Sequence, residues 1–180
     1  FLWAGAYLGA AAWNASRPAA VLPWDPVWTF PFVSAFVVPY LSAYLLPFAV
    51  PFVLRDRAKY RRFAAVAAAT IAFSAACFIL WPLTIARPEL GVSSALDRLL
   101  GALYAADRPT NLFPSLHVSL SFLFAAAVGD ARPRLRPWMT AWAALIAVST
   151  LFTRQHYLID VIGGVLVAWI AWRIYLGKRR

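Results

Sequence analysis

Two histidines and one aspartate are the residues of this sequence best suited to chemistry. His117 lies in FPSLH (113–117) and His156 in RQHYLID (154–160), and these are the two histidines of the chain. Asp160 follows His156 by four residues, so on a helix the two side chains share one face, one turn apart. A carboxylate in that place can hold one imidazole nitrogen and leave the other basic, which makes His156 a candidate nucleophile.

The neighbouring sequence makes these polar residues costly. AWAALIAVSTLF (141–152) precedes the second motif and VIGGVLVAWIAW (161–172) follows its aspartate. Ionisable side chains next to membrane-spanning segments are expensive, and by default they indicate a functional site. The alternative is a structural hydrogen bond between His156 and Asp160 at the membrane interface.

Other kinds of site fit the sequence less well. Two histidines and an aspartate could bind zinc, but the arginines near them favour an anion over a cation. The sequence has neither a glycine-rich phosphate loop nor a G-x-S-x-G nucleophile motif. We therefore expect no metal and no cofactor. Ser115 is expected to cap a helix whose free N–H groups would point at a bound phosphate.

The composition is that of a membrane protein. Of 180 residues, 63% are hydrophobic and 13% charged, and the mean hydropathy is +0.68. The net charge of +10 comes from basic residues at the ends of apolar segments, which indicates membrane topology and no nucleic-acid partner. A single cysteine, Cys77, excludes an internal disulfide. We expect one integral-membrane domain over residues 1–180, with the catalytic motifs within 81–170.

Six segments are apolar over about the length that a spanning helix needs, roughly 20 residues. The predicted fold is an all-α bundle of six transmembrane helices with a short interfacial helix. The predicted spans are 1–16, 34–54, 63–83, 113–129, 138–153 and 157–176. Pro39, Pro47 and Pro51 should kink the second span.

Six alternating spans place the basic stretches 55–62, 132–136 and 173–180 on one face of the membrane. The positive-inside rule makes this face cytoplasmic. We therefore expect a multi-pass protein of the plasma (inner) membrane with both termini in the cytoplasm. The two histidines would then lie on the extracytoplasmic face.

Two connections on that outer face are long. Residues 17–33 hold tryptophans and phenylalanines among prolines and resemble an interfacial lid. Residues 87–112 contain SSALDRLLGALYAA (93–106), whose leucine spacing predicts a short interfacial helix with Ser94 and Asp97 as its capping box. The pattern fits a gate over the site and a plain connecting loop equally well.

FPSLH followed about forty residues later by HYLIDVIGG (156–164) resembles the type-2 phosphatidic acid phosphatase superfamily, whose members have a six-helix membrane fold. The resemblance implies that His156 attacks phosphorus and forms a phosphohistidine, and that Asp160 orients it. His117 would protonate the leaving oxygen and then activate the incoming water or alcohol. Ser115 and nearby backbone would hold phosphoryl oxygens, with no metal or cofactor.

The first motif of that superfamily is incomplete here. It has a lysine seven residues before the arginine of an Arg-Pro pair. Arg87 and Arg108 are each followed by proline, but Leu80 and Gly101 stand at the corresponding lysine positions.

The arginine expected six residues before the nucleophile is Thr150, and Leu116 replaces a common glycine. These departures resemble inositol phosphorylceramide synthases and sphingomyelin synthases, which transfer a phospho-headgroup between lipids. A developing phosphoryl charge still needs cations. Arg87, Arg108 and Arg154 are the candidates, and we favour the first two.

The predicted function is a membrane lipid phosphatase or phosphotransferase that acts on a phospholipid or polyprenyl-phosphate substrate at the outer face of the membrane. Two alternatives stay open: a catalytically inactive relative that binds lipid, and a proton-coupled transporter that uses the histidine and aspartate as a relay. The sequence leaves the oligomeric state open.

Overall fold

The computed structural model describes residues 2–91 and 94–177 and is all-helical. Helices make up 74% of it, and no strand occurs within those residues. The α-helices are α1 (Leu2–Asn14), α2 (Val37–Ser42), α3 (Leu46–Val53), α4 (Arg57–Leu80), α5 (Ala95–Ala106), α6 (Leu116–Ala131), α7 (Arg136–Phe152) and α8 (Leu158–Gly177). Short 3-10 turns cover Pro26–Thr29, Ser34–Phe36, Ala43–Leu45 and Pro133–Leu135.

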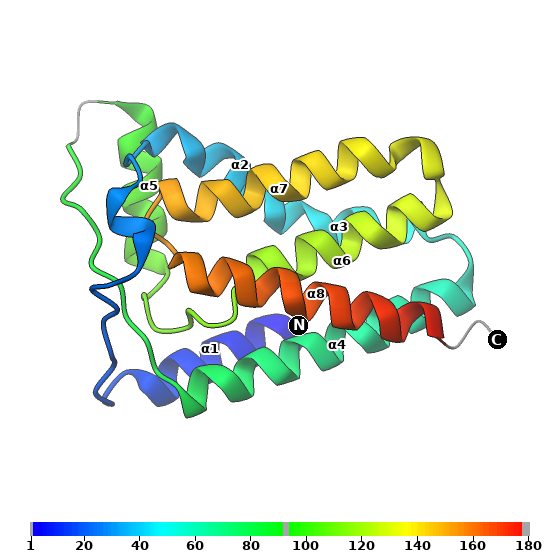
Figure 1. Ribbon diagram of the computed structural model, residues 1–180, viewed down its shortest axis with the longest axis horizontal. Helices are drawn as coiled ribbons and strands as arrows, with labels where there is room; N and C mark the ends of the chain where they lie inside the picture. Colours follow the sequence, from blue (N-terminus) through cyan, green and yellow to red (C-terminus); the bar gives the residue numbers. More distant parts are fainter. Residues whose placement is uncertain (1, 92–93, 178–180) are drawn as a thin grey trace.

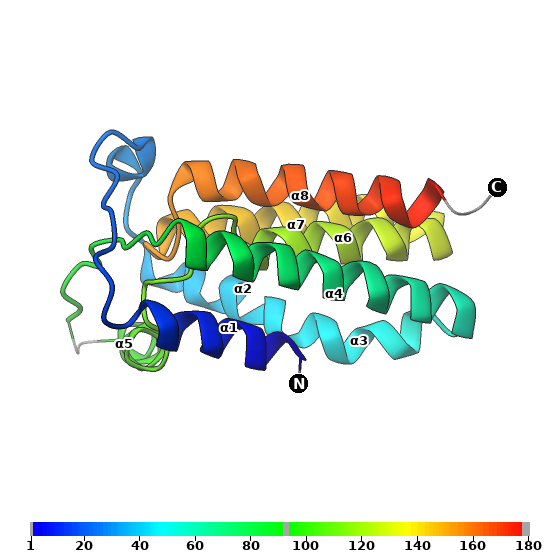
Figure 2. The ribbon, with the colours of Figure 1, turned by 90° about the horizontal axis from the view of Figure 1, so that it is seen from below.

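The long helices run side by side, and α5 lies across one end of the bundle (Figures 1 and 2). We call this the α5 end. Both α6 and α8 begin there, so the segments that carry the two histidine motifs meet at the same end of the molecule. The topology thus brings together residues that are far apart in the sequence.

Three helices are long and apolar enough to cross a membrane: Arg57–Leu80, Pro133–Phe152 and Leu158–Gly177. The chain is therefore a membrane protein. Leu116–Ala131 and Ser34–Leu45 are apolar but shorter, and α1 has 13 described residues. The predicted count of six spans is thus supported for three of them by length and composition.

The second predicted span, 34–54, is interrupted as its prolines indicate. It consists of a 3-10 turn, α2, a second 3-10 turn and α3. Pro47 stands in the first turn of α3 and Pro51 inside that helix. Proline removes a backbone donor and clashes with the preceding turn, so this segment cannot form one regular helix.

The basic stretches lie at the end of the bundle opposite α5. The connection between α3 and α4 and the connection between α6 and α7 are both at this end (Figure 1). They hold residues 54–56 and 132–135, and Arg57 and Arg136 begin the helices that follow. Lys178, Arg179 and Arg180 lie outside the described residues. The folded chain therefore gathers these basic residues at one end of the bundle, as the predicted topology assumes.

The core of the bundle forms around α6, most of whose side chains are buried. Leu123, Phe124, Ala127 and Val128 pack with side chains of α3, α4, α7 and α8 in one hydrophobic cluster. A second cluster at the α5 end joins the connection 17–33 to the start of α8. This second cluster supports the residues of the site.

Candidate active site

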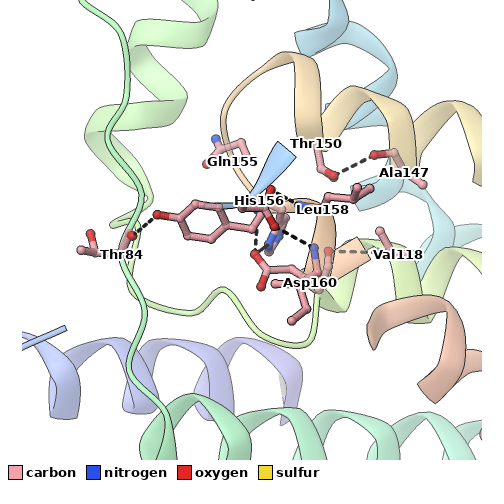
Figure 3. A network of polar contacts seen from close by, with 12 residues as sticks. Thr84, Val118, Ala147, Thr150, Gln155, His156, Leu158 and Asp160 are labelled. Atoms are coloured by element: carbon pink, nitrogen blue, oxygen red, sulfur yellow. Dashed lines mark hydrogen bonds and ion pairs between the residues drawn. The ribbon is translucent and has the colours of Figure 1, made fainter. Parts of the chain in front are cut away.

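His156 and Asp160 are in contact, but not on one helix as predicted. His156 lies in the connection between α7 and α8, because α8 begins only at Leu158. Its Nδ1 is 3.3 Å from Asp160 Oδ2, and the same oxygen accepts a hydrogen bond of 2.8 Å from the Tyr157 backbone N–H (Figure 3). The carboxylate therefore both closes the first turn of α8 and orients the imidazole, leaving Nε2 as the nitrogen able to attack.

His117 lies in the first turn of α6, and its ring centroid is 6.0 Å from that of His156. The rings of Tyr40 and Tyr44 lie against it, at centroid distances of 4.4 and 5.3 Å. Both histidines are buried, with 9% and 4% of their surface exposed. His117 Nε2 is buried and has no hydrogen-bond partner among the described residues.

Ser115 caps α6 as predicted, its hydroxyl accepting the Val118 N–H at 3.4 Å. The Ser115 backbone N–H donates to the Asp160 carbonyl at 3.1 Å. This hydrogen bond joins the FPSLH segment to the HYLIDVIGG segment. Gly164 permits this contact: a Cβ there would lie 2.8 Å from the Ser115 carbonyl oxygen. The glycine pair that ends HYLIDVIGG thus lets α8 approach the start of α6.

Asp25 is a buried residue of the site region that the sequence analysis did not identify. Its Oδ1 accepts the N–H groups of Val27 and Leu158, at 2.8 and 3.0 Å, and its Oδ2 accepts that of Ile159 at 3.2 Å. Leu158 and Ile159 begin α8, so a residue 133 positions away caps this helix. The connection 17–33 is therefore a structural support of the site.

Tyr157 also binds the connection 17–33, through its hydroxyl group. Its hydroxyl donates to the Thr84 carbonyl at 2.8 Å and accepts the Leu22 N–H at 3.1 Å. Burial raises the pKa of Tyr157, so the phenol keeps the proton that it donates. The connection 17–33 and the segment that follows α4 are thereby both held against the residue that follows His156.

Arg154 points to the connection 17–33. Its guanidinium donates to the carbonyls of Val27 and Phe30, the latter at 2.8 Å, and lies 5.8 Å from the Trp28 ring. Its backbone has a φ of 51°, a left-handed conformation that non-glycine residues seldom adopt. The Arg154 guanidinium is thus held by groups of the protein itself, and its position needs no bound phosphate. Its predicted phosphate-binding role stays a prediction.

Arg87 links the C-terminal end of α5 to the connection between α7 and α8, which carries His156. It donates to the backbone carbonyls of Tyr104 and Asp107, at 3.1 and 2.6 Å, and to Oε1 of Gln155, the residue before His156. The Tyr104 hydroxyl also donates to the Thr153 carbonyl at 2.5 Å. Arg87 thus lies next to the site, and sequence reasoning missed Gln155 because a lone glutamine carries no motif.

Arg108 is exposed and lines a pocket at the α5 end together with Tyr44 and Asp107. Tyr44 also contacts the His117 ring, so one residue of the pocket wall adjoins His117. The side chains of Arg87 and Arg154 are hydrogen-bonded to other parts of the chain, whereas within residues 2–91 and 94–177 no such bond is found for the Arg108 side chain. Its predicted role in binding phosphate stays a prediction.

The arrangement can be compared with known families. The family model described as the PAP2 superfamily matches residues 12–174. The chain belongs to the PAP2 superfamily. This is the type-2 phosphatidic acid phosphatase superfamily that the motifs resemble, and membership supports an enzyme of the phosphatase or phosphotransferase type.

The uncharacterized protein MJ0662 of Methanocaldococcus jannaschii is 42% identical to this chain over 96 residues. The match covers 53% of this chain and 40% of that protein, so the chain spans less than half of this relative's length. No solved structure matches the chain.

The PAP2 site has the residue types of phosphoryl transfer through histidine. One imidazole is held by a carboxylate, a second faces it, and the nearby cations are arginines. Within residues 2–91 and 94–177, no three His, Cys, Asp or Glu side chains form a group that could hold a metal ion.

Proposed function

We propose that this chain is a membrane lipid phosphatase or phosphotransferase that works through a phosphohistidine on His156. The observation that carries the proposal is the placement of two buried imidazoles 6.0 Å apart, one of them in contact with Asp160. In a near-attack geometry, His156 Nε2 lies about 3–3.5 Å from the phosphorus that it attacks. Because the two ring centroids are 6.0 Å apart, a phosphate at His156 brings its leaving oxygen near His117.

In the first step, His156 Nε2 attacks phosphorus and the bond from phosphorus to the leaving oxygen breaks. His117 donates a proton to that oxygen, while Asp160 stabilises the positive charge that develops on His156. In the second step, His117 removes a proton from water or from a lipid alcohol, and the resulting oxygen attacks phosphorus and releases His156. Hydrolysis and transfer thus differ only in the acceptor.

Negative charge on the phosphoryl oxygens must be stabilised in both steps. Arg108 is the proposed cation for this purpose, with Ser115 and the free N–H groups at the start of α6 as further donors. Arg87 is proposed to act mainly by holding Gln155, and with it the connection that carries His156, since its guanidinium already binds three oxygens. Arg154 is a weaker candidate because it binds two carbonyls of the connection 17–33.

The substrate class follows from the missing cations. Leu80 and Gly101 stand where the superfamily has the lysine of its first motif, and Thr150 stands where it has an arginine six residues before the nucleophile. These departures resemble the headgroup transferases. We therefore favour transfer of a phospho-headgroup from a phospholipid over hydrolysis of a polyprenyl phosphate. The two reactions differ in the lipid that is cleaved and in the acceptor, which is a lipid alcohol for transfer and water for hydrolysis.

For topology, we propose six membrane passes in a plasma (inner) membrane, with the α5 end on the extracytoplasmic side and both termini in the cytoplasm. The basic connections at the opposite end of the bundle support this orientation. Labelling of single cysteines placed at residues 56 and 98 in intact cells tests it. Reagents that do not cross the membrane should reach only residue 98.

The central test uses purified protein in detergent with phosphatidate, phosphatidylethanolamine and p-nitrophenyl phosphate. His156→Ala should abolish turnover of every substrate that the wild type uses, whereas His117→Ala should accumulate an acid-labile phosphoenzyme with p-nitrophenyl phosphate, whose leaving group needs no proton. Trp138→Phe, a change on an exposed side chain of α7, serves as the control. Turnover that survives in folded His156→Ala protein contradicts the proposal, and lipid binding without turnover identifies an inactive relative.

A further inference from the structure

A pocket of about 640 Å³ opens beside the site, between α1, α5 and the 3-10 turn Ala43–Leu45. One part of its wall is apolar and includes Leu8, Ala11 and Leu103. The other part is polar and is formed by Tyr7, Tyr44, Asp107 and Arg108. Its size lies within the range of pockets that bind small ligands, and its two-part lining fits a molecule with an apolar chain and a charged head.

The polar part of the pocket adjoins the histidines. The Tyr44 ring lies 5.3 Å from that of His117. On the opposite side, Arg87 binds the Asp107 carbonyl together with Gln155, which precedes His156. A lipid whose phosphate reaches the two imidazoles would therefore have its head group next to Tyr44 and Asp107.

Asp107 gives this part of the pocket a negative charge next to a positive one. It is the one acidic side chain among the lining residues, and Arg108 follows it directly. The Tyr7 hydroxyl donates to Asp107 Oδ1 at 2.7 Å, which fixes the carboxylate. Burial raises the pKa of Asp107, while the hydrogen bond from Tyr7 and the charge of Arg87 act in the opposite direction. A cation bound next to this carboxylate compensates for the water that the carboxylate has lost.

This charge pattern discriminates between head groups. A phosphomonoester or diphosphate brings additional negative charge toward Asp107 and is repelled. A head group that carries an amine beside its phosphate places one charge at Arg108 and the opposite charge at Asp107.

We propose that this pocket selects phospholipids whose head group carries an amine, such as ethanolamine or choline, with Asp107 as the counter-charge. The inference rests on the proposed function and names its substrate class. It also gives a reason for the absent motif lysine, since a zwitterionic diester brings less negative charge than a phosphomonoester does. Asp107 is proposed to act in specificity, with no part in bond making.

The test compares phosphatidylethanolamine with phosphatidate at matched acyl chains in mixed micelles. Wild-type protein should have the higher kcat/KM for phosphatidylethanolamine. Asp107→Asn should lower this value roughly tenfold, mainly through KM, as expected for loss of one charged contact, and should leave or raise the value for phosphatidate. Glu89→Gln removes one exposed negative charge outside the pocket and should leave both values unchanged.

Asp107→Glu should retain part of the wild-type preference for phosphatidylethanolamine. Tyr7→Phe, which removes the hydrogen bond to Asp107, should reduce this preference and provides a second test if Asp107→Asn does not fold. A wild-type preference for phosphatidate, or an equal loss for both lipids in Asp107→Asn, overturns the inference. If no phospholipid is turned over, the proposed function fails. Native mass spectrometry of phosphatidylethanolamine and phosphatidate retained by wild type and Asp107→Asn then decides the inference separately, and equal retention overturns it.

Discussion

Asp25 offers the sharpest test of how the site is supported, because it caps α8 from a distant part of the chain. The perturbation is Asp25→Ala. It leaves three backbone N–H groups without their acceptor, those of Val27, Leu158 and Ile159. Asp25 is only 2% exposed, so water reaches these donors poorly. The start of α8, and with it Asp160, should lose its fixed position.

The magnitude follows from the contacts. Loss of a helix cap costs typically about 1 kcal/mol. A buried donor left without a partner adds roughly 1–3 kcal/mol. Allowing for partial rearrangement, we expect a loss of about 2–4 kcal/mol in the free energy of unfolding. Asp25→Asn keeps one oxygen acceptor and should lose about half as much as Asp25→Ala.

The assay is thermal unfolding in detergent, followed by the fluorescence of the nine tryptophans and by circular dichroism. For a chain of this length, the midpoint should fall by about 2–4 °C per kcal/mol. Turnover measured well below the midpoint should fall too, because the carboxylate that orients His156 lies in the first turn of α8.

Asp56→Ala is the matched control for this experiment. Asp56 caps α4, accepting the Lys59 N–H at 2.9 Å, but it is exposed, so water can replace its carboxylate. It should therefore change the midpoint much less than Asp25→Ala does. Equal midpoints for the two variants would refute the reasoning that burial makes the cap of α8 costly to remove.

The remaining predictions concern the dyad, the helix contact, the phosphate cation and the metal. Asp160→Asn should lower kcat by roughly 10²-fold or more while the protein stays folded, and full activity would contradict the dyad. Gly164→Ala puts a Cβ 2.8 Å from a backbone oxygen and should cost about 1–3 kcal/mol in unfolding, whereas Gly5→Ala meets open space and should not destabilise. Arg108→Gln should raise KM about three- to tenfold, and Arg98→Gln on α5 should not; equal effects would reject this ranking. A chelator should leave turnover unchanged, and inhibition reversed by added metal would require a different mechanism.

The sequence determined the local features of this protein. Apolar segments of sufficient length predicted membrane helices, three of which are confirmed by length and composition. The serines that precede α5 and α6 predicted the helix starts, and both caps are confirmed. The prolines of 34–54 predicted the interruption between α2 and α3. Each of these features depends on residues within a few positions of one another, so the pattern alone is sufficient.

The tertiary structure decided what each polar residue contacts. The sequence favoured Arg87 and Arg108 over Arg154 as phosphate-binding residues. In the structure, Arg154 binds the connection 17–33 and Arg87 binds Gln155, 68 positions away. Asp25 showed no motif, because its partners at the start of α8 lie 133 positions away. A hydrogen bond needs two groups within about 3 Å, and over such separations only the packing of the helices brings them that close.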